Sequence, residues 1–334
     1  MRIWRFFVFP QCALWYIFGM KKLFAFSIPT GIGAEFGGYA GDAGFIARKF
    51  AKHFDLIVNP NVVNAGSITA LTDNMIYLEG YAFDKYLSGE IFIKKREKTK
   101  LGVILDAGIP TDVLNIHLNT IEAYKIVKGY NISVDYTEVP VGIEFSVHGG
   151  VSTGCVKNPQ ELLNSAQRLI SKGADAIAIV CYFPDTEDSS YMQGVGIDPI
   201  GGIEGVLSHL ISSKFNVPSA HAPAFSGLDI SFKIENPKLS AETVSATYLP
   251  CVLDGLMQSP SYLNEKTDVA MRLPDGLIVP SSALGSYGVL GAIKNNIPIY
   301  AVKNTSVLDV TAQKMGIKAQ EFKNYEECLN YLIS

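Results

Sequence analysis

The feature that most constrains the fold is a set of short apolar runs without polar alternation. A strand with one face in water alternates apolar and polar residues, whereas a strand buried on both faces is apolar throughout. The runs therefore predict strands of a sheet that helices cover on both faces, as in parallel sheets. They lie at residues 23–28, 56–58, 101–105, 176–180, 276–279 and 297–302.

Helix signals lie between these runs. Asn158 is a predicted N-cap, Pro159 suits the first helical position, and Gly173 suits the end of the same helix. Apolar residues recur at helical spacing between them, from Leu162 to Ile170. This segment therefore predicts one amphipathic helix that packs against a neighbouring strand.

Strands that alternate with helices predict an α/β protein with an open, mostly parallel sheet and helices on both faces. Further helical stripes at residues 45–50 and 203–211 agree with that class. Residues 132–147 look like paired β structure, which leaves a mixed sheet open. We expect a single α/β domain over residues 20–332, and a division into two lobes near residues 140–155 stays open.

The first nineteen residues differ from the rest of the chain. They begin with two arginines and continue mostly with aromatic and apolar side chains, interrupted by Pro10. The run resembles a signal peptide, but no small-residue cleavage site follows and it is too short for a spanning helix. We interpret residues 1–19 as an over-extended start with Met20 as the true beginning, or else as a leader without ordered structure.

Charge and cysteine content restrict the partners. The net charge is −4, and acidic and basic residues are interspersed, which argues against a nucleic-acid partner. The five cysteines form no CxxC pair, so neither a zinc ribbon nor a disulfide framework is expected. Free thiols suit a reducing compartment, so we expect a cytoplasmic protein without a membrane partner. A homo-oligomer stays open.

The loop after the first predicted strand is rich in glycine. Ligands of open α/β sheets bind at the carboxyl ends of strands, where this loop lies. It matches no Rossmann fingerprint, because Phe36 stands where a glycine is required, and no Walker A loop. Its small residues could still approach a ligand closely, although a structural turn is the alternative. The predicted ligand-binding residues are Thr30, Gly31, Gly33, Gly37 and Gly38.

Further polar side chains follow other strands. Asn59, Asn61 and Asn64 follow the second strand and could orient a polar ligand, or they could simply form a turn. Ser281 and Asn304 follow two later strands and could reach the same ligand.

Four residues are candidates for acid–base catalysis because they stand near predicted strand ends or helix starts. They are Asp42, Asp106, Asp198 and His221. Asp106 could instead cap a helix that begins near Asp112, and His221 could be bonded to the backbone. Asp185 is a further ligand-binding candidate. The spacing of the acidic residues matches no EF-hand or zinc pattern, so we predict no metal site.

Cys155 precedes the helix capped by Asn158, where a thiol can have a lowered pKa. A lone cysteine is more often packed than reactive, so we do not assign it as the nucleophile.

Five segments together resemble an uncharacterised bacterial and cyanobacterial family, the domain of unknown function 3326. They are residues 28–34 (IPTGIGA), 37–42 (GGYAGD), 104–109 (ILDAGI), 220–224 (AHAPA) and 249–253 (LPCVL). The resemblance covers about residues 22–332 and implies no known activity.

Residues 173–181 are more loosely similar to the strand that leads to a catalytic cysteine in aspartate/glutamate racemases. Those enzymes use two opposed thiols far apart in sequence, whereas Cys155 stands close before Cys181. The similarity therefore concerns the fold alone.

These residues favour an enzyme that acts by acid–base chemistry on a small polar metabolite carrying a carboxylate or phosphate. Isomerase, lyase and hydrolase chemistry all fit, and the sequence names no cofactor. A non-catalytic sensor of metabolites or nucleotides, or a protein–protein adaptor, stays open.

Overall fold

The computed structural model describes residues 21–39, 43–184, 190–227, 231 and 233–334. The predicted site residues Asp42 and Asp185 and the segment 1–19 lie outside the described residues.

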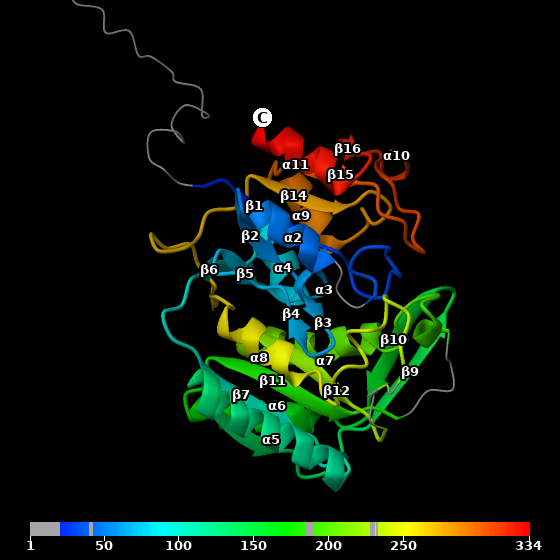
Figure 1. Cartoon of the computed structure of the whole chain (residues 1–334). Coiled ribbons are helices and arrows are strands. Elements are labelled where there is room, and N and C mark those ends of the chain that lie inside the picture. Colours follow the sequence, from blue (N-terminus) through cyan, green and yellow to red (C-terminus); the bar gives the residue numbers. More distant parts are fainter. Residues whose placement is uncertain (1–20, 40–42, 185–189, 228–230, 232) are drawn as a thin grey trace, which may run out of the picture.

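Ten of the described strands form two separate parallel sheets (Figure 1). The first has six strands in the order β16-β15-β14-β1-β2-β5, and every neighbouring pair is parallel. Its strands are β1 (Leu23–Phe26), β2 (Asp55–Val58), β5 (Met75–Tyr77), β14 (Gly276–Pro280), β15 (Ile299–Val302) and β16 (Gln320–Phe322). The predicted runs at residues 23–28, 56–58, 276–279 and 297–302 correspond to strands of this sheet.

The second sheet has four parallel strands in the order β12-β11-β7-β8. They are β7 (Lys100–Leu105), β8 (Asn131–Tyr136), β11 (Ala176–Tyr182) and β12 (Ser219–Ala224). The predicted α/β class with parallel strands is therefore confirmed, with two sheets instead of one.

Three antiparallel pairs stand apart from these sheets. They are β3 (Asn64–Ala65) with β4 (Ile68–Thr69), β6 (Phe92–Lys94) with β13 (Ser261–Leu263), and β9 (Ile143–His148) with β10 (Val151–Val156). The β structure expected at residues 132–147 is present, but its halves do not pair with each other. β8 joins the parallel sheet, and β9 turns back against β10.

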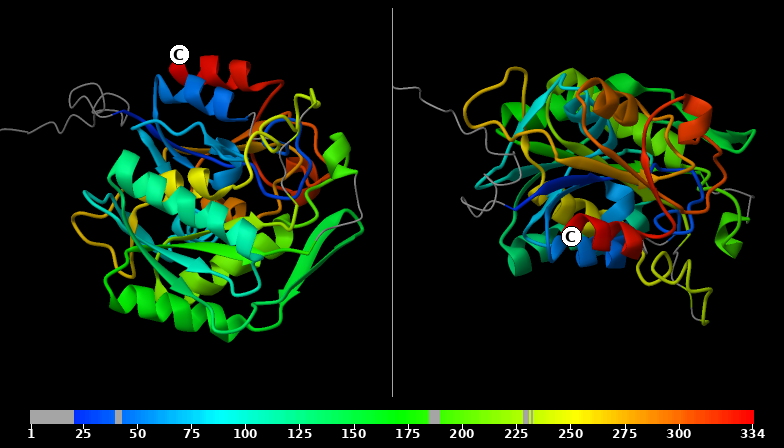
Figure 2. Two further views of the ribbon diagram at one scale, coloured as in Figure 1. Left: turned by 60° about the horizontal axis from the view of Figure 1, so that its bottom comes forward. Right: turned by 90° about the horizontal axis from the view of Figure 1, so that it is seen from above.

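Helices cover both faces of each sheet. The six-stranded sheet packs α2 (Ala43–Ala51) and α11 (Tyr325–Ile333) on one face, and α4 (Gly80–Leu87) and α9 (Tyr287–Lys294) on the other. Figure 2 shows α11, in red, beside α2, in blue. The four-stranded sheet packs α5 (Thr111–Lys128) and α8 (Leu249–Met257) on one face, and α6 (Pro159–Ser171) and α7 (Gly201–Phe215) on the other. The short helices are α3 (Pro60–Val63), α10 (Ala312–Met315) and the 3-10 turn η1 (Tyr191–Gln193).

The path of the chain brings distant segments together. The chain leaves the first sheet after β5, builds the second sheet, and returns for β14, which pairs with β1. One buried apolar cluster contains residues of both sheets together with α8, which lies between them in Figure 1. Loops of the first sheet therefore lie near α7, α8 and β12 of the second.

The β9–β10 pair packs directly against the start of α7, and a glycine permits this contact. A Cβ atom added at Gly202 would lie 2.2 Å from the carbonyl oxygen of Ser152. The Ser152 Oγ accepts a hydrogen bond from the Gly202 N–H at 3.0 Å. Gly205, in the same helix, has nothing within 4 Å of the equivalent position.

We expect Gly202→Ala to lower the free energy of unfolding by about 1–3 kcal/mol, because the new methyl group overpacks the contact. Gly205→Ala is the matched control. It should raise the free energy by up to about 1 kcal/mol, because alanine favours the helix. Urea unfolding of both variants measures the difference, and stabilisation by both substitutions would contradict the contact.

Candidate functional site

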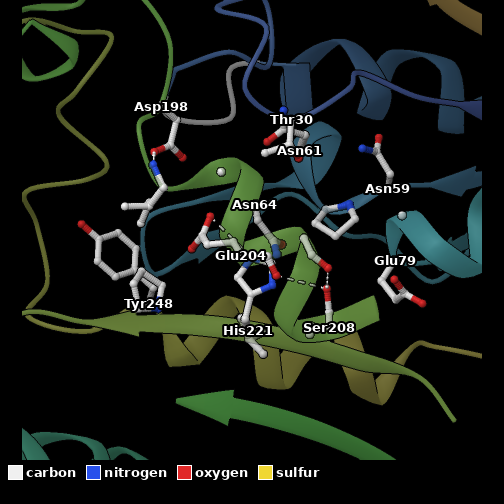
Figure 3. Close-up of a pocket in the computed structure, with 18 of the residues that line it drawn as sticks. Thr30, Asn59, Asn61, Asn64, Glu79, Asp198, Glu204, Ser208, His221 and Tyr248 are labelled. Carbon is white, nitrogen blue, oxygen red and sulfur yellow. Dashed lines mark hydrogen bonds and ion pairs between the residues drawn. The ribbon is translucent and has the colours of Figure 1, made fainter. Parts of the chain in front are cut away.

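A cavity of about 580 Å³ lies where loops of the first sheet meet α7 and β12 (Figure 3). The first sheet contributes residues that follow three strands: Pro29 and Thr30 after β1, Asn59, Asn61 and Asn64 after β2, and Glu79 after β5. The elements around the second sheet contribute Asp198, Glu204 and Ser208 near or in α7, His221 in β12, and Tyr248 and Cys251 at the start of α8. The cavity therefore lies at the carboxyl end of the first sheet, where open α/β sheets bind ligands.

The centre of the cavity holds a histidine paired with a carboxylate. Ala220 and Ala222 of β12 face the core with α8, so the alternation of the strand turns His221 toward α7. Glu204 lies in the first turn of α7, and its Oε2 is 3.5 Å from the His221 Nε2. The Nδ1 of His221 is buried and has no hydrogen-bond partner among the described residues. An Nε2–H that faces Glu204 leaves Nδ1 as an acceptor.

A second carboxylate lies close to this pair. The Asp198 carboxylate accepts a hydrogen bond from the Ile200 N–H at 3.0 Å. Burial, and then the negative charge of Glu204, raise the pKa of Asp198 well above its usual range. Asp198 is therefore a candidate proton donor beside the His221–Glu204 pair.

Aromatic side chains form the wall on the Asp198 side of the cavity. The Tyr191 hydroxyl donates to the Glu242 carboxylate at 3.3 Å, and the Tyr248 hydroxyl donates to the Glu242 backbone carbonyl at 3.4 Å. Phe225 packs edge-to-face on Tyr248, with ring centroids 6.3 Å apart. In the view of Figure 3, Tyr248 and Asp198 lie to the left of the Glu204–His221 pair.

A further group of lining residues is Asn64, Tyr77 and Glu79. The Asn64 Nδ2 donates to the Tyr77 hydroxyl at 3.3 Å, and the Asn64 Oδ1 is buried without a partner among the described residues. Glu79 caps α4 by accepting hydrogen bonds from the N–H groups of Tyr81 and Ala82, at 2.9 and 3.1 Å. Burial raises the pKa of Glu79 from an ordinary value near 4.5 to about 7.

This raised pKa predicts a pH dependence of stability. In the unfolded chain Glu79 loses its proton near its ordinary pKa, whereas the folded protein keeps it until about pH 7. The folded state therefore binds more protons between these values, and the free energy of unfolding should fall by roughly 2–3 kcal/mol as the pH rises from about 4.5 to 7. Urea unfolding across this range should show a shallower slope for Glu79→Gln. The exposed Glu265→Gln is the control, and equal slopes in all three proteins would contradict the assignment.

The family model described as "Protein of unknown function (DUF3326)" matches residues 24–334. The chain belongs to this family. A Synechococcus protein named as an uncharacterised lipoprotein is 36% identical over 317 residues, which cover 91% of this chain and 88% of the relative. No solved structure matches the chain.

The relative corrects one expectation for this DUF3326 protein. Free cysteines suggested a cytoplasmic location, but the matching Synechococcus protein is named a lipoprotein, which does not fit that location. Unpaired thiols alone are therefore a poor guide to compartment here. In the described part of the chain, no helix is both long and apolar enough to cross a membrane.

Several predicted site residues of the DUF3326 protein line the cavity: Thr30, Asn59, Asn61, Asn64, Asp198 and His221. Two of the asparagines also hold loops of the fold. Asn59 accepts from the Ile28 N–H at 3.1 Å and donates to the Ile28 carbonyl at 2.8 Å, which joins the ends of β1 and β2. Asn61 donates to the Pro29 carbonyl at 3.1 Å. The turn explanation thus accounts for Asn59 and Asn61, whereas Asn64 keeps a buried acceptor without a partner.

The glycines of the first loop lie outside the cavity lining. Gly31, Gly33 and Gly37 have positive φ, which few other residues adopt. A Cβ atom at Gly33 would lie 2.5 Å from the carbonyl oxygen of Gly196, and one at Gly38 would lie 2.2 Å from backbone atoms of Ala34. These glycines let the loop fold back on itself and approach the segment before α7.

Asp106, Ser281 and Asn304 also lie outside the cavity lining. Asp106 accepts backbone hydrogen bonds within the second sheet, and the Asn304 amide bonds to the backbone N–H and carbonyl of Phe36. Ser281 donates its backbone N–H to the Val302 carbonyl. At least Asp106 and Asn304 thus use their side chains to hold loops in place.

Cys155 and Cys181 are likewise absent from the lining. Cys181 is buried in β11, and burial raises its pKa, whereas the Glu144 carboxylate raises the pKa of the exposed Cys155. Cys251 is the cysteine that lines the cavity, and burial raises its pKa too, so it is a thiol. None of the three therefore has the lowered pKa that a nucleophilic thiol needs.

Sequence reasoning missed four lining residues with polar side chains that matter to the chemistry: Tyr77, Glu79, Glu204 and Glu242. Tyr77 ends strand β5 and Glu79 follows it, so the rule that selected the asparagines applies to Glu79 as well. Glu204 lies within the predicted helical stripe at residues 203–211, and no local pattern joins it to His221. Glu242 lies in an irregular segment, where no local pattern marks a site.

Proposed function

We propose that this DUF3326 protein binds a small polar molecule in the cavity and acts on it by acid–base chemistry through His221. The observation that carries the proposal is the His221–Glu204 pair inside the cavity, with a buried Nδ1 that has no partner among the described residues. Buried polar atoms are normally paired, and exceptions often mark a site of ligand binding or catalysis.

The proposed mechanism gives each side chain one role. His221 accepts a proton from the bound molecule at Nδ1, and the Glu204 carboxylate stabilises the imidazolium that forms at Nε2. Asp198, whose pKa is raised by burial and by the charge of Glu204, is the group that returns a proton to the substrate. A base and an acid on one cavity wall are typical of acid–base catalysis. Isomerisation, elimination and hydrolysis all use such a pair.

The test uses the whole protein and a mixture of polar metabolites. The mixture is incubated in D2O with the wild-type protein or with His221→Gln, and mass spectrometry follows every component. We expect at least one component to be converted, or to gain deuterium, with the wild type alone. Ligand binding by both proteins, without any difference in conversion or exchange, would contradict the enzyme and favour a non-catalytic sensor.

A further inference from the structure

The ionisable side chains of the cavity lining are mostly acidic. Five carboxyl groups line it, and none of the described lining residues is Lys or Arg. They are Glu79, Asp84, Asp198, Glu204 and Glu242. A carboxylate- or phosphate-bearing ligand would be repelled by these groups unless other donors compensated for them.

Helix N-termini could supply such donors, and several helices begin at this cavity. Free N–H groups in the first turn of a helix attract anions. Here side chains of the protein itself accept hydrogen bonds from N–H groups at these ends. The acceptors are Glu79 at α4, Asp198 and Ser152 at α7, Thr247 at α8 and Ser286 at α9. The helix ends thus already have acceptors within the protein, which leaves less attraction for an anionic ligand.

The atoms that lack partners are acceptors. The Asn64 Oδ1 accepts hydrogen bonds, and the His221 Nδ1 does so when Nε2–H faces Glu204. A ligand with N–H groups would satisfy both. Figure 3 shows Asn64, Glu204 and His221 together at the middle of the cavity.

One side of the cavity combines carboxylates with aromatic rings. Tyr191 and Tyr248 both bond to Glu242, and the negative charges of Glu204 and Glu242 raise the pKa of Asp198 further. Tyr39 stacks on Tyr191 with ring centroids 5.2 Å apart. Aromatic faces beside carboxylates are a common arrangement for binding ammonium groups.

We infer that the ligand is a cationic amine, and that its ammonium group lies against the Glu242 carboxylate and the rings of Tyr191 and Tyr248. This inference names the substrate class of the proposed enzyme and rests on that proposal. An ammonium group at this position would offset the repulsion between the acidic side chains and would leave the rest of the molecule to extend toward His221.

The test compares two probes of similar shape and opposite charge, butylammonium and butyrate, by titration calorimetry with the full chain. We expect butylammonium to bind and butyrate not to bind. Glu242→Gln should weaken butylammonium binding about tenfold, because a charged hydrogen bond is lost. Tyr248→Leu should weaken it by a similar factor, since the cation–π contact disappears. Glu265→Gln, an exposed residue with the same change of charge, should leave the affinity unchanged.

Butyrate binding, or equal behaviour of the two probes, overturns the inference. Unchanged affinity in Glu242→Gln and Tyr248→Leu overturns the assigned position. His221→Gln separates this proposal from the acid–base proposal, because it should abolish the conversion while the preference for butylammonium over butyrate stays. If conversion depends on His221 but the protein does not prefer amines, only the inference about the amine ligand is rejected. If amines bind but nothing is converted, only the acid–base proposal is rejected.

Discussion

Replacing His221 with glutamine is expected to lower turnover by about 100-fold to 10,000-fold while the protein stays folded. Glutamine keeps a polar side chain of similar length but cannot carry a proton at neutral pH. The side chain lies on an edge strand beside the cavity, so the substitution leaves the core of the sheet intact. Turnover of the substrate found in the D2O experiment, measured with binding of the same molecule, separates the loss of chemistry from the loss of affinity.

Two further variants sharpen this result. Glu204→Gln should lower turnover less, by about tenfold to 100-fold, because it removes the partner of the imidazolium but keeps His221. It should also shift the pH profile of turnover, which a purely structural role would not do. His53→Gln, exposed and absent from the cavity lining, should retain full turnover. Full activity of His221→Gln would show that the His221–Glu204 pair is structural.

Replacing Asp106 with alanine is expected to lower the free energy of unfolding by about 3–5 kcal/mol. Asp106 is 2% exposed, and its carboxylate accepts backbone hydrogen bonds from Gly108, Val141 and Tyr182 at 3.0, 2.9 and 3.1 Å. These donors join the end of β7 to the segment before β9 and to β11. Without the carboxylate, three backbone N–H groups at the end of the second sheet and in the adjoining loops would lose their acceptor.

The matched control for this substitution is Asp112→Ala. Asp112 is exposed in the first turn of α5, where a carboxylate contributes at most about 1 kcal/mol. Urea unfolding should show a larger loss of unfolding free energy for Asp106→Ala than for Asp112→Ala. Because Asp106 does not line the cavity, the turnover of folded Asp106→Ala molecules should equal that of the wild type. A stable but inactive Asp106→Ala would restore the catalytic role expected from the sequence.

Asp106 shows why polar residues at strand ends are an ambiguous signal. The same side chains that bind ligands also accept hydrogen bonds from neighbouring loops, and the sequence lists only the donors and acceptors, not which of them meet. Asp198 and His221 line the cavity, whereas Asp106 and Asn304 hold loops, although all four were chosen by a similar rule.

The glycine-rich loop after β1 shows the same ambiguity for backbone geometry. From the sequence, these glycines were expected either to approach a ligand closely or to form a structural turn. In the structure, they have positive φ or make tight contacts within the protein. The contact partner of Gly33 is the backbone of Gly196 and not a ligand, and this partner is far away in sequence. The glycine content of a loop can therefore indicate that its backbone makes close contacts, but it does not identify the group that it contacts.

Local patterns in the sequence determined the elements of this protein. The apolar runs became buried strands, and Pro159 and Gly173 mark the limits of α6 as expected, although the Asn158 side chain bonds to the Pro140 carbonyl instead of capping the helix. These features depend on the burial and backbone preferences of neighbouring residues, which a short window contains.

Only the tertiary structure decided how the strands divide between two sheets and which polar residues meet. Apolar strands are interchangeable as pairing partners, so the runs alone cannot tell that β14 pairs with β1 or that β7 belongs to another sheet. The approach of Glu204 to His221 and the mostly acidic lining of the cavity arise from contacts between segments distant in sequence. Such contacts depend on the packing of the whole chain, and no local pattern carries them.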